Sequence, residues 1–161
     1  MDGSRIAKFP SSFPDISDEL VRRFASRAAD HDRRGEIGLD NIEDLRKGGF
    51  LSLAVPLRKG ERGISLRQLT RVIERVALGD PSTALILAMQ YLQTAAIVAS
   101  DRWPDDVRNE VLESVVRSGA LVNALRVEPE LGTPARGGVP ATRVRREGGR
   151  WLLSGRKIFS T

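Results

Sequence analysis

The side chains that could do chemistry in this 161-residue chain are concentrated in two short stretches near its C-terminal end. The first, "VEPELGT" (127–133), has a carboxylate at Glu128 and a hydroxyl at Thr133. The second, "SGRKIFST" (154–161), has an ammonium group at Lys157, then an aromatic ring and two hydroxyls. Hydroxyl and backbone groups can hold a pyrophosphate, and an aromatic ring can lie against a flat apolar ligand. These two stretches are therefore the candidate binding site.

Several other kinds of site are excluded by composition. The chain has no cysteine, so it has no disulfide, thiolate metal site or cysteine nucleophile, and its single histidine, His31, cannot form a multi-histidine metal centre. We therefore predict no metal site. Asp30, His31 and Asp32 follow a predicted helix in a run of charged residues, which is typical of a solvated surface.

The formal net charge is +5, from 26 basic and 21 acidic residues. We interpret the basic residues as scattered along predicted helices beside Asp and Glu, so we expect no nucleic-acid partner. The N-terminal residues lack a positively charged segment followed by a long apolar run, so no signal peptide is predicted. The most apolar segment, 84–99, is shorter than the roughly 20 residues that span a bilayer. It predicts a buried helix, with no membrane span, and we expect a cytoplasmic protein.

Helix-capping residues and apolar periodicity predict a helical N-terminal region. Ser17, Asp40, Ser65 and Asp80 each suit the start of a helix, and Pro104 opens the last one. The predicted stops are Gly48 and Gly49 for the second helix, and Gly119 for the last. Residues 50–65, between the second and third helices, are predicted to form a structured loop.

After residue 119 the apolar period changes from about 3.6 to 2, which is typical of strands. We predict strands over 120–127 and 141–147, a hairpin turn at Gly148 and Gly149, and one or two strands over 150–161. The predicted fold class is α+β: an all-α helical bundle over 1–118, followed by the first strands of a β-sheet or barrel domain over 119–161. So few strands cannot bury both faces alone, so we expect that residues are missing or that something covers them.

Four stretches, in this order, resemble the acyl-CoA dehydrogenase family of flavoproteins. They are "LSLAVPLRKGERGIS", in which Glu61 stands where a second glycine is usual, "VIERVALGDPSTALIL", "VEPELGT" and "SGRKIFST". The resemblance covers nearly the whole chain. It implies that the chain is the N-terminal part of a longer flavoprotein and ends before a C-terminal helical bundle.

The resemblance implies an FAD-dependent oxidoreductase of fatty acid metabolism. Such an enzyme dehydrogenates the α,β bond of an acyl-CoA thioester, with hydride transfer to flavin N5. The carboxylate base of the family lies in the C-terminal bundle, so no catalytic residue is assigned here, and the chain alone is expected to be inactive. The implied partners are acyl-CoA or a related small molecule, an electron-transfer partner or oxygen, and, in the full-length form, further copies of the chain.

The resemblance also assigns cofactor-binding roles. The backbone of Leu125 and Val127 would lie near the flavin ring, and the Thr133 hydroxyl would reach the pyrophosphate. Phe159 would lie against the ring, and Ser160 and Thr161 would approach the N5 edge. Each has a simpler competing interpretation: Thr133 as a turn residue and Phe159 as a strand core residue, for example.

Four charged or substituted positions qualify this assignment. We interpret Lys157 as solvated or locally paired, and Glu128 as shaping its loop, with no acid–base role. Val127 stands where the family commonly has Thr or Ser, and Pro134 replaces the usual Asp. This loop is similar to that of the desulfurisation-type flavin monooxygenases. Two alternatives therefore remain: a flavin-dependent monooxygenase of the same fold, or a catalytically inactive truncated module whose exposed strands pair with a partner protein.

Overall fold

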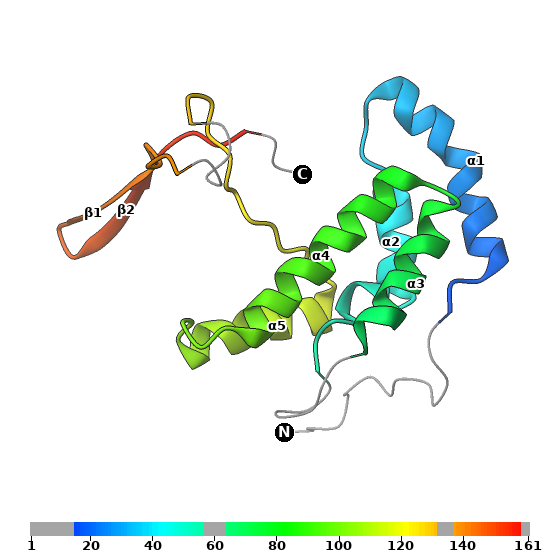
Figure 1. Cartoon of the computed structure of the whole chain (residues 1–161), viewed down its shortest axis with the longest axis horizontal. Coiled ribbons are helices and arrows are strands. Elements are labelled where there is room, and N and C mark those ends of the chain that lie inside the picture. The colour runs from blue at the N-terminus through cyan, green and yellow to red at the C-terminus, as the bar shows by residue number, and fades with distance from the viewer. Residues whose placement is uncertain (1–14, 57–63, 132–136, 159–161) are drawn as a thin grey trace. The chain divides into compact units, whose positions relative to one another are not determined.

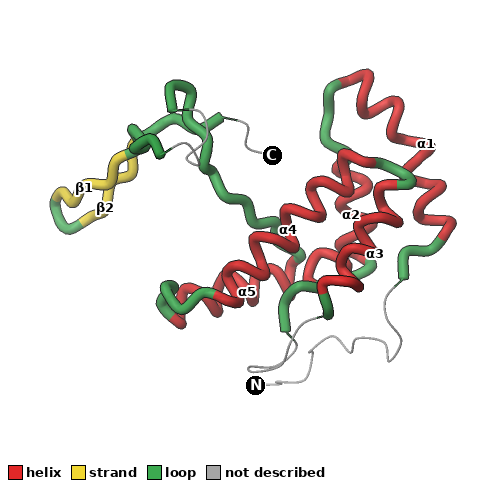
Figure 2. The backbone as a smooth tube through the Cα atoms, viewed as in Figure 1, coloured by secondary structure: helices red, strands yellow, loops and turns green. Residues whose placement is uncertain are grey.

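The computed structural model describes residues 15–56, 64–131 and 137–158 (Figure 1). The chain divides into two compact units, Met1–Leu121 and Val122–Thr161. The elements are α1 (Asp18–Arg34), α2 (Leu39–Lys47), the 3-10 turn η1 (Phe50–Ser52), α3 (Leu66–Ala77), α4 (Pro81–Ala99), α5 (Asp105–Ser118), β1 (Arg143–Glu147) and β2 (Arg150–Ser154). Figure 2 shows helices followed by a short two-stranded sheet, which confirms the predicted α+β class. The predicted domain boundary between residues 118 and 119 stays a prediction.

Most helix starts in the first unit follow the predicted caps. The Ser17 side chain accepts a hydrogen bond from the Leu20 N–H at 3.2 Å, and Asp80 caps α4. Ser65 and Gln68 form a complete capping box at α3. For α2 the predicted cap residue, Asp40, was wrong, because the N-cap is Gly38.

The Asp40 carboxylate is instead engaged by side chains of α1. Its oxygens lie 3.1 Å from the Arg27 Nε and 3.2 Å from the His31 Nε2. Asp40 therefore sits inside the first turn of α2, where a negative charge also suits the helix dipole.

The core of the first unit is built from residues of α1, α2, α3 and α4 and from the turn after α2. Among the helices, α3 and α4 pack most extensively against each other. The buried cluster consists of Ile16, Phe24, Ile42, Leu45, Phe50, Leu51, Leu53, Ala54, Leu69, Val72, Val76, Ala84, Leu87 and Tyr91. Residues 50–54, predicted as a structured loop, are thus core residues, held by the Tyr91 hydroxyl, which donates to the Phe50 carbonyl at 2.8 Å.

The central apolar helix α4 is buried on one side only. Leu87 is fully buried, whereas Leu85 and Leu92 are 63% and 60% exposed. By length and composition alone α4 could cross a membrane, but a core helix of a globular unit has the same properties. The prediction of a buried helix holds for the face that packs on α3 and η1.

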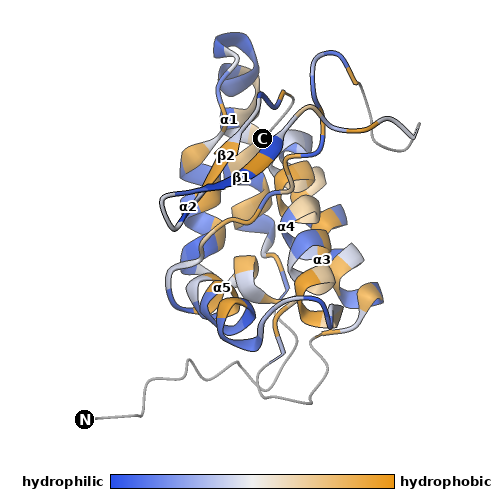
Figure 3. Ribbon diagram, turned by 90° about the vertical axis from the view of Figure 1, so that its left-hand side faces the viewer, coloured by the Kyte–Doolittle hydropathy of each residue, from blue (hydrophilic) through white to orange (hydrophobic). Residues whose placement is uncertain are grey.

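The second unit contains one antiparallel hairpin. Arg143 pairs with Ser154 and Glu147 with Arg150, and the turn residues Gly148 and Gly149 have φ values of 55° and 80°. Two successive positive φ angles indicate a type I′ turn, as predicted for Gly-Gly. In Figure 3 β1 is coloured hydrophilic and β2 largely hydrophobic.

Two strand predictions were wrong in extent. Residues 120–127 form no strand, and of the one or two strands predicted over 150–161, β2 ends at Ser154 and residues 155–158 form none. Residues 159–161 lie outside the described residues. Segment 120–127 has the alternation of a strand, but a strand also needs a neighbour for its N–H and C=O groups. Among the described residues, the Ile158 N–H bonds to the Val127 carbonyl, but no continuous ladder forms along 120–127.

The positive charge is not scattered, which corrects the interpretation from the sequence. Residues 122–161 contain eight of the 26 basic residues and three of the 21 acidic residues, and therefore the whole formal excess of five charges. Residues 1–121 are formally neutral by the same count. The second unit is therefore strongly basic.

Candidate functional site

Two of the six predicted cofactor-binding residues lie in described segments. The Leu125 side chain is 55% exposed, and the Val127 carbonyl accepts a hydrogen bond from the Ile158 N–H at 3.0 Å. Thr133, Phe159, Ser160 and Thr161 lie outside the described residues. The described residues show instead how the two motif stretches are held in place.

Glu128 makes most of the contacts that hold the two motif stretches. It is only 3% exposed, and its carboxylate accepts four hydrogen bonds. The donors are the Ala141 N–H at 2.6 Å, the Thr142 N–H at 3.2 Å, the Thr142 hydroxyl at 2.5 Å and the Lys157 ammonium at 2.6 Å. We call Glu128, Ala141, Thr142 and Lys157 the Glu128 cluster.

The cluster strongly favours the ionised form of Glu128. The hydrogen bond from Lys157, followed by that from Thr142, lowers the pKa of the Glu128 carboxyl to about 2. A carboxylate with this pKa is a poor proton acceptor near neutral pH, and its oxygens are already occupied. The geometry therefore supports the predicted loop-shaping role and gives Glu128 no acid–base role.

The Glu128 cluster also connects the two motif stretches. Glu128 and Lys157 are separated by 29 residues in sequence, and the adjacent Val127 carbonyl meets the Ile158 N–H. Lys157 is 22% exposed at its side chain, so the prediction that it is locally paired is confirmed. The two motif stretches are thus held side by side by one partly buried ion pair and one backbone hydrogen bond.

The sequence analysis missed Thr142, which lies just before β1. A signal for its contact was present in the glycine of "SGRK": a Cβ at Gly155 would come within 2.2 Å of the Thr142 hydroxyl oxygen. Only a glycine lets Thr142 approach the loop that follows β2 without displacement. Gly155 therefore makes room for the Glu128 cluster.

His31 is less solvated than predicted, although it forms no site. Its side chain is 12% exposed and its Nε2 lies 3.2 Å from Asp40. The imidazole packs beside Gly38, where an added Cβ would meet Nδ1 at 2.9 Å. Among the residues that the structure describes, no group of three or more His, Cys, Asp or Glu side chains could hold a metal ion.

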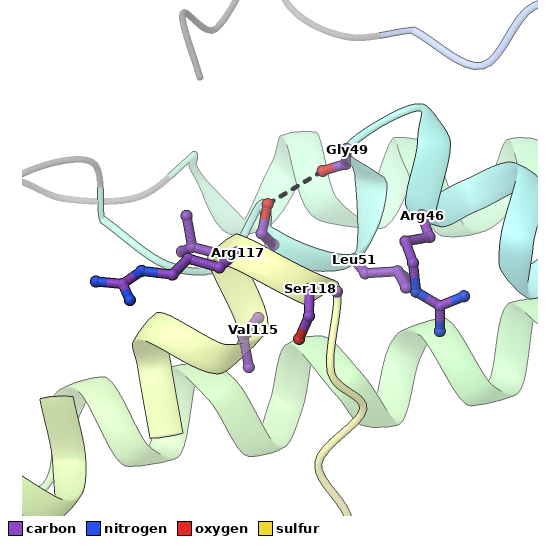
Figure 4. A pocket seen from close by; sticks show the side chains of 9 residues that line it. Arg46, Gly49, Leu51, Val115, Arg117 and Ser118 are labelled. Atoms are coloured by element: carbon purple, nitrogen blue, oxygen red, sulfur yellow. Dashed lines mark hydrogen bonds between the residues drawn. The ribbon is translucent and has the colours of Figure 1, made fainter. Parts of the chain in front are cut away.

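The first unit has a hollow of about 130 Å³ between η1 and the end of α5 (Figure 4). Its polar lining includes Ser52, whose hydroxyl donates to the Gly49 carbonyl at 3.2 Å. Figure 4 shows the Arg46 and Arg117 side chains directed away from each other. Charged groups do not converge in the hollow, so it is not a candidate site.

Comparison with known proteins identifies relatives of this chain. The family profile "Acyl-CoA dehydrogenase, N-terminal domain" matches residues 15–102. A putative acyl-CoA dehydrogenase of Bacillus subtilis (strain 168) is 34% identical over 88% of this chain and 37% of that protein.

Two solved structures are also similar. KijD3 in complex with dTDP is 30% identical with a TM-score of 0.73, over 88% of this chain and 36% of that one. A nitrososynthase from Micromonospora carbonacea var. africana is 27% identical with a TM-score of 0.71, with the same two shares.

The chain thus spans about a third of the length of these relatives. The profile covers more than half of the chain, from the start of α1 to just before α5. The chain belongs to the acyl-CoA dehydrogenase family of flavoproteins, and its helical unit contains the N-terminal domain of that family.

Proposed function

We propose that this chain is the N-terminal part of an FAD-dependent oxidoreductase that dehydrogenates the α,β bond of an acyl-CoA thioester. Family membership and the 34% identity to a putative acyl-CoA dehydrogenase support this function. The observation that carries it furthest is the Glu128 cluster, which joins the two stretches with the family's flavin-loop sequences. Bound FAD would supply a hydride acceptor at N5.

The described residues fit a flavin. Residues 125–127 belong to no helix or strand, so their backbone N–H groups are not used in a helix or a sheet ladder. The exposed Leu125 side chain offers apolar area beside it. The Val127 carbonyl is bonded to Ile158, which leaves the Val127 N–H as the group we assign to the flavin edge.

The remaining roles belong to residues outside the described segments. In the proposed site the Thr133 hydroxyl donates to the pyrophosphate, Phe159 packs on the ring, and Ser160 and Thr161 lie near N5. The Glu128 cluster contacts none of these groups and acts by fixing the backbone on either side of them. Glu128 is therefore a positioning residue.

FAD titration of the chain tests this assignment. We expect weak quenching of flavin fluorescence by the wild-type chain, lost in Glu128→Gln and Thr133→Val. Glu130→Gln is the matched control, because Glu130 is an exposed carboxylate two residues away. Equal quenching by all four chains would contradict the proposed flavin contacts.

A flavin-dependent monooxygenase of the same fold is the second candidate. The similarity to a nitrososynthase and the apolar Val127 at the flavin edge favour it. The full-length protein separates the two candidates: a dehydrogenase bleaches its flavin when acyl-CoA is added without oxygen. A monooxygenase leaves the flavin oxidised under those conditions, and consumes oxygen once the flavin is reduced.

A further inference from the structure

The β1–β2 hairpin has two chemically different faces. Cross-strand partners share a face and successive residues alternate between faces. One face, which we call the arginine face, consists of Arg143, Arg145, Glu147, Arg150, Leu152 and Ser154. The other, the apolar face, consists of Val144, Arg146, Trp151 and Leu153. All ten residues are exposed in the structure.

The arginine face has one acidic residue, and that residue is already paired. Glu147 lies 3.3 Å from the guanidinium of Arg145. Within the described segments, Arg143 and Arg150 form no ion pair. This face therefore carries uncompensated positive charge, and it lies in the unit that holds the whole charge excess of the chain.

The side chains on the two faces indicate which face of the hairpin is in contact with solvent. Val144, Trp151 and Leu153 are 59%, 71% and 73% exposed, which is unfavourable for large apolar side chains on one surface. An antiparallel sheet with one apolar and one charged face buries the apolar face and leaves the charged one in solvent. The arginine face is therefore the outer surface of the sheet.

We propose that the arginine face of this hairpin docks an acidic surface of a partner protein. The two unpaired arginines, Arg143 and Arg150, lie four residues apart in register on one face, about 13 Å along the strands. Carboxylates on every fourth residue of an extended partner strand have the same spacing. Guanidinium groups bind carboxylates through paired hydrogen bonds. The inference does not depend on flavin binding.

Other anionic partners fit less well. Single-stranded nucleic acid needs aromatic stacking beside its phosphate contacts, but Trp151 lies on the opposite face, with the Arg146 guanidinium 5.9 Å from its ring centre. A lipid surface would need apolar side chains that enter it together with the basic ones. On the arginine face Leu152 is the one large apolar side chain, so this face does not suit a lipid surface.

A labelled peptide that alternates Glu and Thr tests the proposal on the whole 161-residue chain. We expect fluorescence anisotropy to show binding that weakens as salt is raised. Arg143→Gln with Arg150→Gln should weaken binding roughly tenfold, because both unpaired guanidinium groups are lost. Arg146→Gln is the control on the opposite face of the hairpin. Because it removes one charge, it is compared with Arg143→Gln and Arg150→Gln made singly.

The outcomes separate the alternatives. Weaker binding in the double variant together with unchanged binding in Arg146→Gln supports the proposal, provided that circular dichroism shows equal folding. Equal losses in Arg146→Gln and in each single variant of the arginine face would overturn it, because net charge alone would then explain the binding. Tighter binding of a single-stranded oligonucleotide, or of vesicles with phosphatidylserine, would also overturn it. So would a second copy of the chain, shown by a dimer in sedimentation that the double variant abolishes.

Discussion

The two units of this chain are organised by different kinds of contact. The helical unit buries a continuous apolar cluster that includes Phe24, Leu45 and Leu87, each with no exposed surface. The second unit has no such cluster in its described part, and its only buried residue there is a carboxylate, Glu128. The first is stabilised by apolar area removed from water, and the second by a polar cluster that fixes geometry.

This difference indicates what each unit needs. A helical unit with its own core can keep its structure through many surface changes. A short hairpin with two exposed faces is marginal in water unless other elements cover it. The polar cluster therefore sets the local shape of the motif stretches, while most of the stability of that region has to come from further contacts.

The largest expected effect tests the core of the helical unit. Leu87→Ala should lower its free energy of unfolding by about 2–5 kcal/mol, because a fully buried side chain leaves a cavity. Urea denaturation followed by far-UV circular dichroism measures this loss. Leu85→Ala, on the exposed side of the same helix, should change it by about 0.5 kcal/mol or less. Equal losses would show that the open face of α4 is covered in solution.

The second effect tests the polar organisation of the other unit. Glu128→Gln removes the charge that holds Lys157, so the Ala141, Thr142 and Ile158 amides should exchange hydrogen roughly tenfold faster. Mass-resolved or NMR-detected exchange measures each segment. In the control variant Glu130→Gln the exchange rates of these amides should stay unchanged. Unchanged rates in Glu128→Gln would mean that the motif stretches are held by other contacts.

The pH dependence of the same cluster sharpens this test. Folding lowers the pKa of Glu128 from 4.5 to about 2, so its stabilisation is complete above the unfolded value and is lost as the pH falls towards the folded one. NMR shifts of the Ala141 and Thr142 amides should therefore titrate with a midpoint near 2. A midpoint near the ordinary value of 4.5 would show that the cluster is not formed.

Contacts within one turn of a helix could be predicted from the sequence. Ser17, Ser65 and Asp80 cap helices as expected, because a cap depends on residues two or three positions away. Asp40 followed the same pattern and failed, because Arg27 and His31 of α1 engage its carboxylate. No local pattern includes that contact.

The candidate site was predictable in its sequence motifs and not in its assembly. The resemblance located both stretches and assigned Glu128 a structural role. Thr142 was missed because it lies 14 residues from Glu128, across a loop that no periodicity constrains. The strand at 120–127 was wrongly predicted because alternation describes side chains, whereas a strand also requires a continuous ladder of backbone hydrogen bonds to a neighbour.

The smallest effect returns to polar contacts, this time in the helical unit. Ser65→Ala should lower the free energy of unfolding by about 1 kcal/mol, because the Gln68 N–H loses its capping oxygen. Ser65→Asp should restore most of that stability, because a carboxylate caps the same N–H and interacts favourably with the helix dipole. A loss as large as that of Leu87→Ala would break the comparison, because an exposed polar cap would then stabilise this unit as strongly as its buried core.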